Sequence, residues 1–313
     1  MAPTAPARAS TMPKKVLIQL DCDPQPSTFD AIVAVDAGAD VLLRHGGVTP
    51  ENVVPLVHGG MFTRGGPDLA ATAIFVGGAD VAAADAVAET VRKTFFGPVR
   101  LGVLVDPAGA NTTAAAAVIA AGRHVALERA SATPCRAVVL GATGPVGGRV
   151  ARLLAALGCR VAIVSRSRER AADLAAGIAT QLPAAAARIE PIEHHSSGCL
   201  PGSAFAQAIA GAEVVIAAGA AGATLLDEAG CRSAASARVI IDLNAVPPAG
   251  IEGVTPVDKA RSEGGTIRYG ALGIGGTKMK IHKAAVARIF ADPTAFLGTA
   301  EVFAIGAALE AAT

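Results

Sequence analysis

The chain has 313 residues, of which 52% are hydrophobic and 17% are charged, and its formal net charge is +1. This length allows one large domain or two domains of ordinary size, and the small net charge argues against a nucleic-acid-binding protein, which usually carries a basic face. The mean hydropathy is +0.48, but much of it comes from alanine, and we find no apolar run of the roughly 18 residues that a membrane-spanning helix needs.

Two further features bear on the compartment. The five cysteines are scattered and form no CxxC pair, which is typical of reduced thiols in the cytoplasm and disfavours a structural metal site. Residues 1–13 lack the apolar stretch of a secretory signal, so we expect them to form a disordered arm. The sequence therefore predicts a soluble cytoplasmic protein that holds no metal.

In the first part of the chain, predicted strands alternate with predicted helices. Apolar runs predict strands at 16–20, 41–43, 73–76 and 99–105. Between them, Ser27 is placed to cap a helix that runs through residue 34, and apolar residues at helical spacing predict a helix over 80–95. An alanine-rich helix is expected after Thr113. This alternation is typical of a parallel α/β sheet.

The alternation starts again after a plausible domain junction at 129–134. Strands are predicted at 136–140, 160–164, 212–217 and 237–242, with helices over 145–157 and 168–180. We therefore expect two parallel-sheet α/β domains, the second of Rossmann type, with a C-terminal helical tail that packs back on the first. The expected boundaries are 14–128 for the first domain, completed by 278–313, and 129–277 for the second.

A glycine-rich turn in the second domain predicts a dinucleotide site. It follows the apolar strand at 136–140 and opens an amphipathic helix, which is the context that gives a glycine motif its meaning. The first glycine permits a tight turn, the second lets a pyrophosphate approach, and the third lets helix and strand pack closely. The spacing is GxxGxxG, a variant of the usual GxGxxG. The predicted contacts are Gly141, Thr143, Gly144, Pro145, Val146 and Gly147.

The end of the next strand indicates which dinucleotide binds. NAD sites usually place an acid there to hold the ribose 2′-hydroxyl, whereas an arginine pairs with the 2′-phosphate of NADP. This chain has no acid at that point and instead has Ser165, Arg166 and Arg168. We therefore predict NADP, held in part by these three residues. Asn244, after a later strand, is a further predicted cofactor contact.

Several segments in order along the chain carry a resemblance to one enzyme family. They are Asp21-Cys-Asp23, Ser27-Thr-Phe-Asp30, Phe62-Thr-Arg-Gly-Gly66, Ala73-Ile-Phe-Val-Gly-Gly78, Phe95-Phe-Gly-Pro98, Asn111-Thr-Thr113 and Gly270-Ala-Leu-Gly-Ile-Gly-Gly276-Thr-Lys278. The chain resembles the NADP-dependent methylene-tetrahydromethanopterin dehydrogenases of bacterial one-carbon metabolism over about residues 14 to 305. The last segment and the Thr-Arg-Gly-Gly segment are the most specific.

The resemblance implies an activity and a set of substrate contacts. Such enzymes pass a hydride from a methylene-tetrahydropterin to NADP⁺, in a cleft between a pterin-binding first domain and the Rossmann domain. Lys278 is the implied active-site residue, with Lys280 as the alternative, and its ammonium would orient the pterin ring. The implied substrate contacts are Asp21, Asp23, Thr63, Arg64, Asn111, Thr112 and Thr113, although capping of turns and helices is an equally strong alternative for several of them. The family also implies a homo-oligomer.

Three other functions are alternatives to this activity. The same fold serves methylene-tetrahydrofolate dehydrogenases, whose substrate shares the reacting ring system. A reductase similar to shikimate dehydrogenase finds no support in the first domain. Because a fold does not dictate a function, a non-catalytic NADP-binding sensor is the third alternative, and Thr63, Arg64 and Lys278 argue against it.

Overall fold

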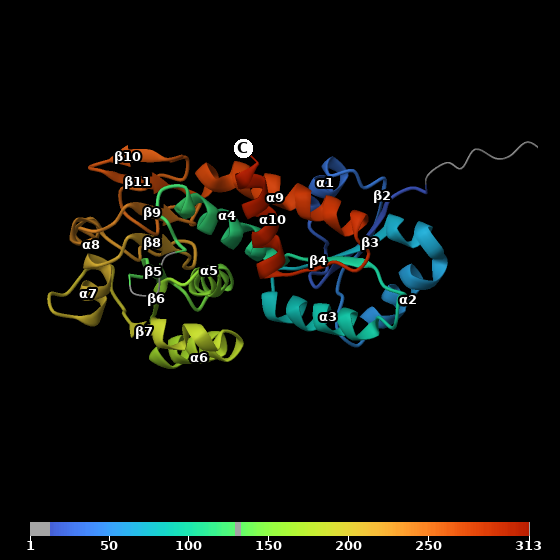
Figure 1. Cartoon of the computed structure of the whole chain (residues 1–313), viewed down its shortest axis with the longest axis horizontal. Coiled ribbons are helices and arrows are strands. Elements are labelled where there is room, and N and C mark those ends of the chain that lie inside the picture. The colour runs from blue at the N-terminus through green and yellow to red at the C-terminus, as the bar shows by residue number, and fades with distance from the viewer. Residues whose placement is uncertain (1–12, 129–132, 313) are drawn as a thin grey trace, which may run out of the picture. The chain divides into compact units, whose positions relative to one another are not determined.

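The computed structural model describes residues 13–128 and 133–312 of the chain. These residues form two compact units (Figure 1). The first unit runs to Val105 and also takes in Val286–Phe296, and the second comprises Asp106–Ala285 together with the chain from Leu297 onward. The predicted N-terminal arm and most of the predicted junction at 129–134 lie outside the described residues.

The sheet of the first unit has five strands in the order β12-β4-β3-β1-β2. β1 pairs in parallel with both β2 and β3, and β3 pairs in parallel with β4. The elements of this unit in chain order are β1 (Val16–Asp21), α1 (Thr28–Asp36), β2 (Val41–His45), α2 (Val53–Thr63), a 3-10 helix (Gly66–Ala71), β3 (Thr72–Gly77), α3 (Val81–Thr94), β4 (Gly102–Val105) and, from the end of the chain, β12 (Phe296–Leu297).

Polar side chains fix where two helices of this unit begin. The hydroxyl of Ser27 accepts the N–H of Asp30 and caps α1, which confirms the predicted start of that helix. The carboxylate of Asp80 accepts the N–H groups of Ala82 and Ala83 and caps α3 in the same way. Both helices therefore start in the short loops that follow the carboxyl ends of β1 and β3.

The second unit holds a seven-stranded sheet. Its elements in chain order are a 3-10 turn (Pro107–Gly109), α4 (Ala110–Gly122), β5 (Arg136–Leu140), α5 (Pro145–Ala156), β6 (Arg160–Ser165), α6 (Arg168–Gln181), a 3-10 helix (Pro183–Arg188), β7 (Ile189–Glu193), α7 (Ala204–Ala210), β8 (Val214–Ala217), α8 (Glu228–Ser233), β9 (Val239–Asp242), β10 (Arg261–Glu263), β11 (Thr266–Tyr269), α9 (Ala271–Ala291) and α10 (Thr299–Ala311).

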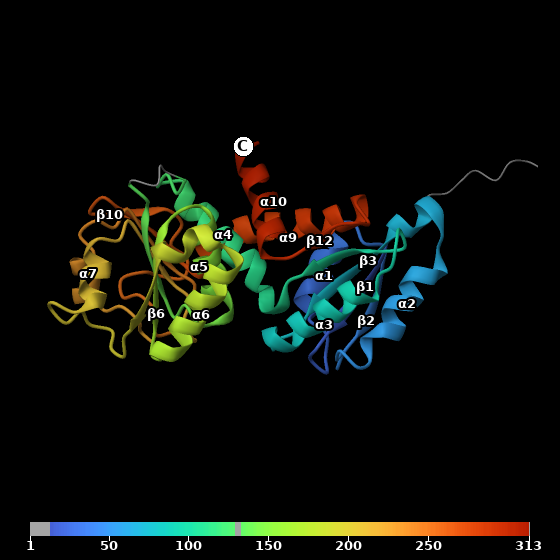
Figure 2. The same cartoon turned by 60° about the horizontal axis from the view of Figure 1, so that its bottom comes forward.

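The strand order of this sheet, β10-β11-β9-β8-β5-β6-β7, is that of a Rossmann fold with one added antiparallel edge strand, β10. The chain moves outward from β5 to β7 and then crosses back to β8. Because such crossovers are right-handed, α5 and α6 cover one face of the sheet and α7 lies on the other (Figure 2). In this fold ligands bind where the order reverses, here at the carboxyl ends of β5 and β8.

The C-terminal tail is helical, as predicted, and its segments belong to different units. From Val286 onward α9 belongs to the first unit, where a Cβ on Gly102 of β4 would stand 2.0 Å from the carbonyl oxygen of Ile289. α10 belongs to the second unit and packs against α4. α4 is buried along nearly its whole length against α5 and α10, so it belongs to the second unit. The domain boundary predicted from the sequence had placed this helix in the first domain.

Three properties of the described residues concern membranes and metals. None of their helices combines the length and apolar character that would let it cross a bilayer. All five cysteines are described, and all five are free thiols. In the described portion of the chain, no three His, Cys, Asp or Glu side chains gather closely enough to hold a metal ion.

Candidate functional site

The predicted glycine turn connects β5 to α5 at the point where the strand order reverses. Gly141 has a φ of +66°, and a Cβ there would lie 2.5 Å from the Cα of Gly219, beyond the end of β8. A Cβ on Gly147 would lie 2.7 Å from the Cα of Ala142, so glycine allows α5 to pack closely on the turn. Gly144 is the N-cap residue of α5 and Pro145 its first residue. This geometry fits a dinucleotide, whose pyrophosphate would meet the free N–H groups of the helix N-terminus.

The predicted NADP-selecting residues lie beside this turn. The hydroxyl of Ser165, at the end of β6, lies 3.1 Å from the hydroxyl of Thr143 and also accepts the N–H of Ser167. Arg166 and Arg168 are exposed. A third arginine, Arg170, donates from Nη2 to the carbonyl oxygen of Thr143 at 3.4 Å. The structure thus places three arginine residues in the segment that follows β6, where a 2′-phosphate binds in this fold.

Asn244 lies on the same edge of the sheet, two strands away from the glycine turn. Leu140, Ala217 and Asp242 align across β5, β8 and β9, and Asn244 comes two residues after Asp242. Its amide donates to the carbonyl oxygen of Pro248 and accepts the N–H of Val246. Burial raises the pKa of Asp242, which accepts the N–H groups of Asn244 and Ile251. The Asn244 side chain therefore shapes the loop after β9.

Lys278 lies on α9 of the second unit, against the turn that precedes α4. Gly109 in that turn has a φ of +63°, and a Cβ there would stand only 2.4 Å from Nζ of Lys278. Asp106 and His282 are both completely buried. Burial lowers the pKa of His282, and the neighbouring charge of Lys278 lowers it further, although the carboxylate of Asp106 opposes both effects. The buried imidazole is therefore harder to protonate than a free one.

The predicted substrate residues Asn111, Thr112 and Thr113 form the first turn of α4. The N–H groups of Asn111 and Thr112 donate to the carboxylate of Asp106 at 2.8 and 3.1 Å, and the hydroxyl of Thr112 donates to it at 2.6 Å. The hydroxyl of Thr113 donates to the carbonyl oxygen of Gly109 at 2.6 Å. Asp106 thus caps α4 from outside, and the three residues lie beside Lys278 in the same unit.

The four substrate residues predicted in the first unit lie at opposite ends of its sheet. Asp21, at the carboxyl end of β1, is completely buried and accepts the N–H groups of Asp23 and Ser27. Asp23 accepts the N–H of Ala79 beyond β3. Both carboxylates therefore make the turn and capping contacts that were the alternative to substrate binding.

Arg64 lies at the other, amino end of the same strands. Its guanidinium donates to the carbonyl oxygens of Lys14 and Ala71 and to the hydroxyl of Thr72, the first residue of β3. Thr63 donates to the carbonyl oxygen of Gly59 within α2. With about 3.3 Å per strand residue, the length of β1 separates the two ends by roughly 17 Å. The structure does not bring Thr63 and Arg64 together with Asp21 and Asp23.

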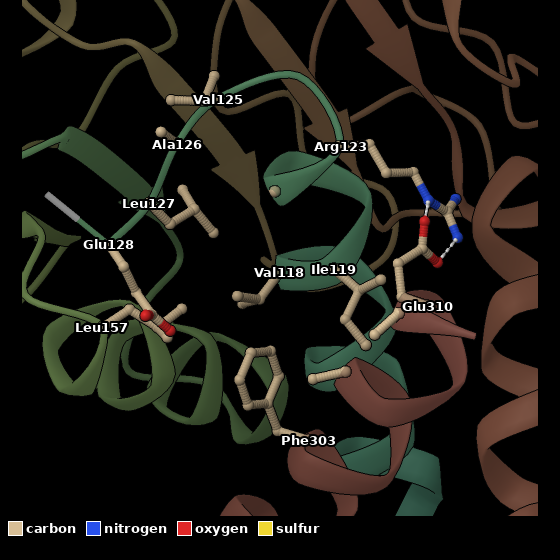
Figure 3. Close-up of a pocket in the computed structure, with 13 residues that line it drawn as sticks. Val118, Ile119, Arg123, Val125, Ala126, Leu127, Glu128, Leu157, Phe303 and Glu310 are labelled. Atoms are coloured by element: carbon tan, nitrogen blue, oxygen red, sulfur yellow. Dashed lines mark hydrogen bonds and ion pairs between the residues drawn. The ribbon is translucent and has the colours of Figure 1, made fainter. Parts of the chain in front are cut away.

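A separate cavity of about 450 Å³ opens in the second unit, between the end of α4 and α10 (Figure 3). Val118, Leu157 and Phe303 point into it, and a two-bond ion pair between Arg123 and Glu310 closes one side. Neither the glycine turn nor Lys278 lines this cavity. It is therefore distinct from the predicted dinucleotide site.

Three polar residues that the structure places in these sites were not predicted from the sequence. Arg170 continues the alternate-residue spacing of Arg166 and Arg168, which was the available signal. Asp106 follows a buried strand directly, the usual position of a functional carboxylate in this class of fold. Arg149 gave no signal, because its contact with Asn111 crosses 38 positions of the sequence.

Sequence similarity to known proteins identifies the family of this chain. Residues 28–108 match the family model described as methylene-tetrahydromethanopterin dehydrogenase, N-terminal. The bifunctional protein MdtA of Methylorubrum extorquens is 40% identical over 292 residues, which are 93% of this chain and 98% of that protein. A second relative from the same organism, named NAD(P)-dependent methylenetetrahydromethanopterin dehydrogenase, is 33% identical over 80% of this chain and 84% of its own length. The chain belongs to the methylene-tetrahydromethanopterin dehydrogenase family.

A solved structure supports the fold independently of the family. Quinate dehydrogenase from Corynebacterium glutamicum, determined in complex with NAD, superposes with a TM-score of 0.51 and covers 94% of this chain and 99% of its own. Only 13% of the aligned residues are identical, so this likeness concerns the fold alone. It confirms the predicted class of two α/β units, the second with a Rossmann-type sheet.

Proposed function

We propose that this chain transfers a hydride from methylene-tetrahydromethanopterin to NADP⁺ and so gives the methenyl form and NADPH during one-carbon oxidation. The observation that carries the proposal is the combination, in one compact unit, of a Rossmann glycine turn with a lysine held beside the first turn of α4. Relatedness to MdtA over nearly the full length of both chains supports it.

The residues at the reversal point have distinct roles in this proposal. The first turn of α5 holds the pyrophosphate through its free N–H groups and the positive end of the helix dipole. Arg166, Arg168 and Arg170 hold the 2′-phosphate through charge-assisted hydrogen bonds. When bound, NADP⁺ supplies the carbon that accepts the hydride.

The donor side requires orientation more than acid–base chemistry. The hydride leaves a carbon flanked by two nitrogens, whose lone pairs stabilise the cation that remains, so no nucleophile or strong base is needed. The rate then depends on holding donor and acceptor in contact and in line. Lys278 provides this orientation by donating from its ammonium to a carbonyl oxygen of the pterin.

The test follows reduced-cofactor formation by the purified protein with methylene-tetrahydromethanopterin or methylene-tetrahydrofolate, each with NADP⁺ or NAD⁺. The highest kcat/KM is expected for the methanopterin donor with NADP⁺. A higher value with the folate donor would make the chain a methylene-tetrahydrofolate dehydrogenase. If the protein bound NADP⁺ but turned over neither donor, the proposed enzymatic function would be rejected, and a role as a cofactor-binding sensor would be supported instead.

The three arginines at the end of β6 predict how NADP⁺ is selected over NAD⁺. Changing Arg166 or Arg170 to alanine is expected to raise the Kd for NADP⁺ about tenfold, because each loses a charge-assisted bond of about 1.4 kcal/mol or more. The Kd for NAD⁺, which has no 2′-phosphate, stays the same. Calorimetric titration with both cofactors measures the effect. Arg232→Ala, which removes an exposed arginine paired with Glu228 on α8, is the control, and equal losses for both cofactors would contradict the assignment.

We also place the protein in the cytoplasm, as a homo-oligomer. Five free thiols support the compartment. The weakly charged, alanine-rich composition supports burial of surface between subunits.

A further inference from the structure

Three helices of the second unit meet at one buried side chain, that of Asn111. This residue is only 2% exposed. Its Oδ1 accepts one hydrogen bond from Nε of Arg149 on α5 and another from the hydroxyl of Thr299, the first residue of α10, both at 2.6 Å. An amide oxygen has two lone pairs, and a bond from a charged guanidinium is stronger than a neutral one. Asn111 therefore joins α4, α5 and α10 at fixed points.

One arm of this junction ends at the pyrophosphate turn. Arg149 lies one turn into α5, and its Nη1 donates to the carbonyl oxygen of Pro145 at 3.1 Å. Pro145 is the first residue of α5, directly after Gly144. The planar guanidinium thus connects the first turn of α5, which faces the cofactor phosphates, to Asn111.

The other arm ends at Lys278. The N–H of Asn111 donates to the buried carboxylate of Asp106, which also holds both polar groups of Thr112. This carboxylate fixes the start of α4 and the turn that ends in Gly109. The ammonium of Lys278 lies against Gly109, so closely that a Cβ there would stand 2.4 Å from Nζ. The hydrogen-bonded path from Arg149 through Asn111 to Asp106 consists of buried or half-buried groups, and Lys278 lies against the turn that follows Asp106.

We propose that Arg149 and Asn111 are positioning residues, which fix the separation between the pyrophosphate turn and the Lys278 ammonium. The inference rests on the proposed hydride transfer, in which one group holds the cofactor and the other orients the donor. Displacing an aligned pair by about 1 Å costs on the order of a hundredfold in rate. Asn111 therefore acts from inside the fold, and its side-chain oxygen is occupied by Arg149 and Thr299.

The kinetic test uses Arg149→Met, which keeps much of the side-chain length and removes both hydrogen bonds. With both substrates saturating, kcat is expected to fall at least tenfold, on the scale of such a displacement, while the Kd for NADP⁺ changes less than threefold. Arg149→Lys, which keeps one donor, is expected to recover part of kcat. An unchanged kcat in Arg149→Met, with the protein folded at the assay temperature, would overturn the proposal.

A second readout needs no turnover. Lysines dimethylated with ¹³C give separate NMR signals, and the signal of Lys278 is identified by its loss in Lys278→Arg. Arg149→Met is expected to shift this signal. The matched control is Arg44→Met in the first unit, where Nε of Arg44 donates to the amide oxygen of Gln19 and Nη2 to the carbonyl oxygen of Pro26. The control is expected to leave the Lys278 signal unchanged.

The two readouts separate two kinds of failure. If the wild-type protein turns over no methylene-pterin, the proposed function fails, but the Lys278 signal still tests the junction. A Lys278 signal that is the same in Arg149→Met and in the wild type would overturn the positioning role whatever the activity. A shift in Arg44→Met as large as in Arg149→Met would also overturn it.

Discussion

Lys278→Met is expected to lower kcat about a hundredfold, the usual effect of removing one pre-oriented donor from an active site, and to leave the Kd for NADP⁺ unchanged. Methionine keeps the apolar stem of the side chain and removes the ammonium. The expected loss follows from the place of Nζ, which lies against Gly109 in the group that also holds the buried Asp106 and His282. Steady-state kinetics together with calorimetric titration of NADP⁺ measure both quantities.

Two further variants test whether the position of the ammonium matters. Lys280→Met changes an exposed lysine of the same helix whose charge acts on Glu310, and it is expected to keep kcat within twofold. Gly109→Ala keeps the lysine but adds a methyl group 2.4 Å from the present position of Nζ, which forces the ammonium to move, so kcat is expected to fall. If Lys280→Met lost activity and Lys278→Met did not, Lys280 would be the active-site lysine, the alternative that the sequence left open.

Gly141→Ala is expected to raise the Kd for NADP⁺ at least tenfold. Two effects act together: an L-residue in the left-handed region costs about 1–2 kcal/mol, and the added Cβ would lie 2.5 Å from the Cα of Gly219. Because the added Cβ would clash with the backbone of Gly219, the turn itself must move. Its N–H groups would then lose their alignment toward the phosphates. Calorimetry gives the Kd, and thermal unfolding gives the loss of stability.

Gly158→Ala separates the two effects. Gly158 also has a positive φ, +89°, but a Cβ there would meet no atom within 4 Å. This variant is expected to lose a similar amount of stability to backbone strain and to keep the wild-type Kd for NADP⁺. If Gly158→Ala weakened NADP⁺ binding as much as Gly141→Ala, general destabilisation would explain both results and the turn would have no special role.

Several element boundaries needed information that the sequence pattern does not carry. The helix α2 was not predicted, because Pro55, Gly59 and Gly60 weaken its helical signal. β4 begins at Gly102 and not at Val99, since the N–H of Val99 turns back to the carbonyl oxygen of Phe96. β7, also missed, is a short edge strand that contains Pro191.

The sequence by itself determined the local structure of the dinucleotide site. Apolar runs set the strands on either side, and the glycines of the turn meet steric demands that arise within a few residues, as Gly147 does against Ala142. The grouping of Ser165, Arg166 and Arg168 near that turn also followed, because in a Rossmann fold the first two strands lie side by side. Family membership followed from segments in order along the chain and is confirmed by the relatives.

Only the tertiary structure decided which polar residues share a site. Asp21 and Arg64 both lie next to strands of the same sheet, but Asp21 is at the carboxyl ends of these parallel strands and Arg64 is at their amino ends. The linear pattern of the sequence does not encode this separation. The sequence predicted Asn111 as a substrate contact, with helix capping as the alternative, but in the structure its oxygen accepts hydrogen bonds from Arg149 and Thr299, which lie 38 and 188 positions away. Strands and tight turns depend on neighbours in the sequence, whereas the partner of a buried polar group depends on which distant helices pack against it.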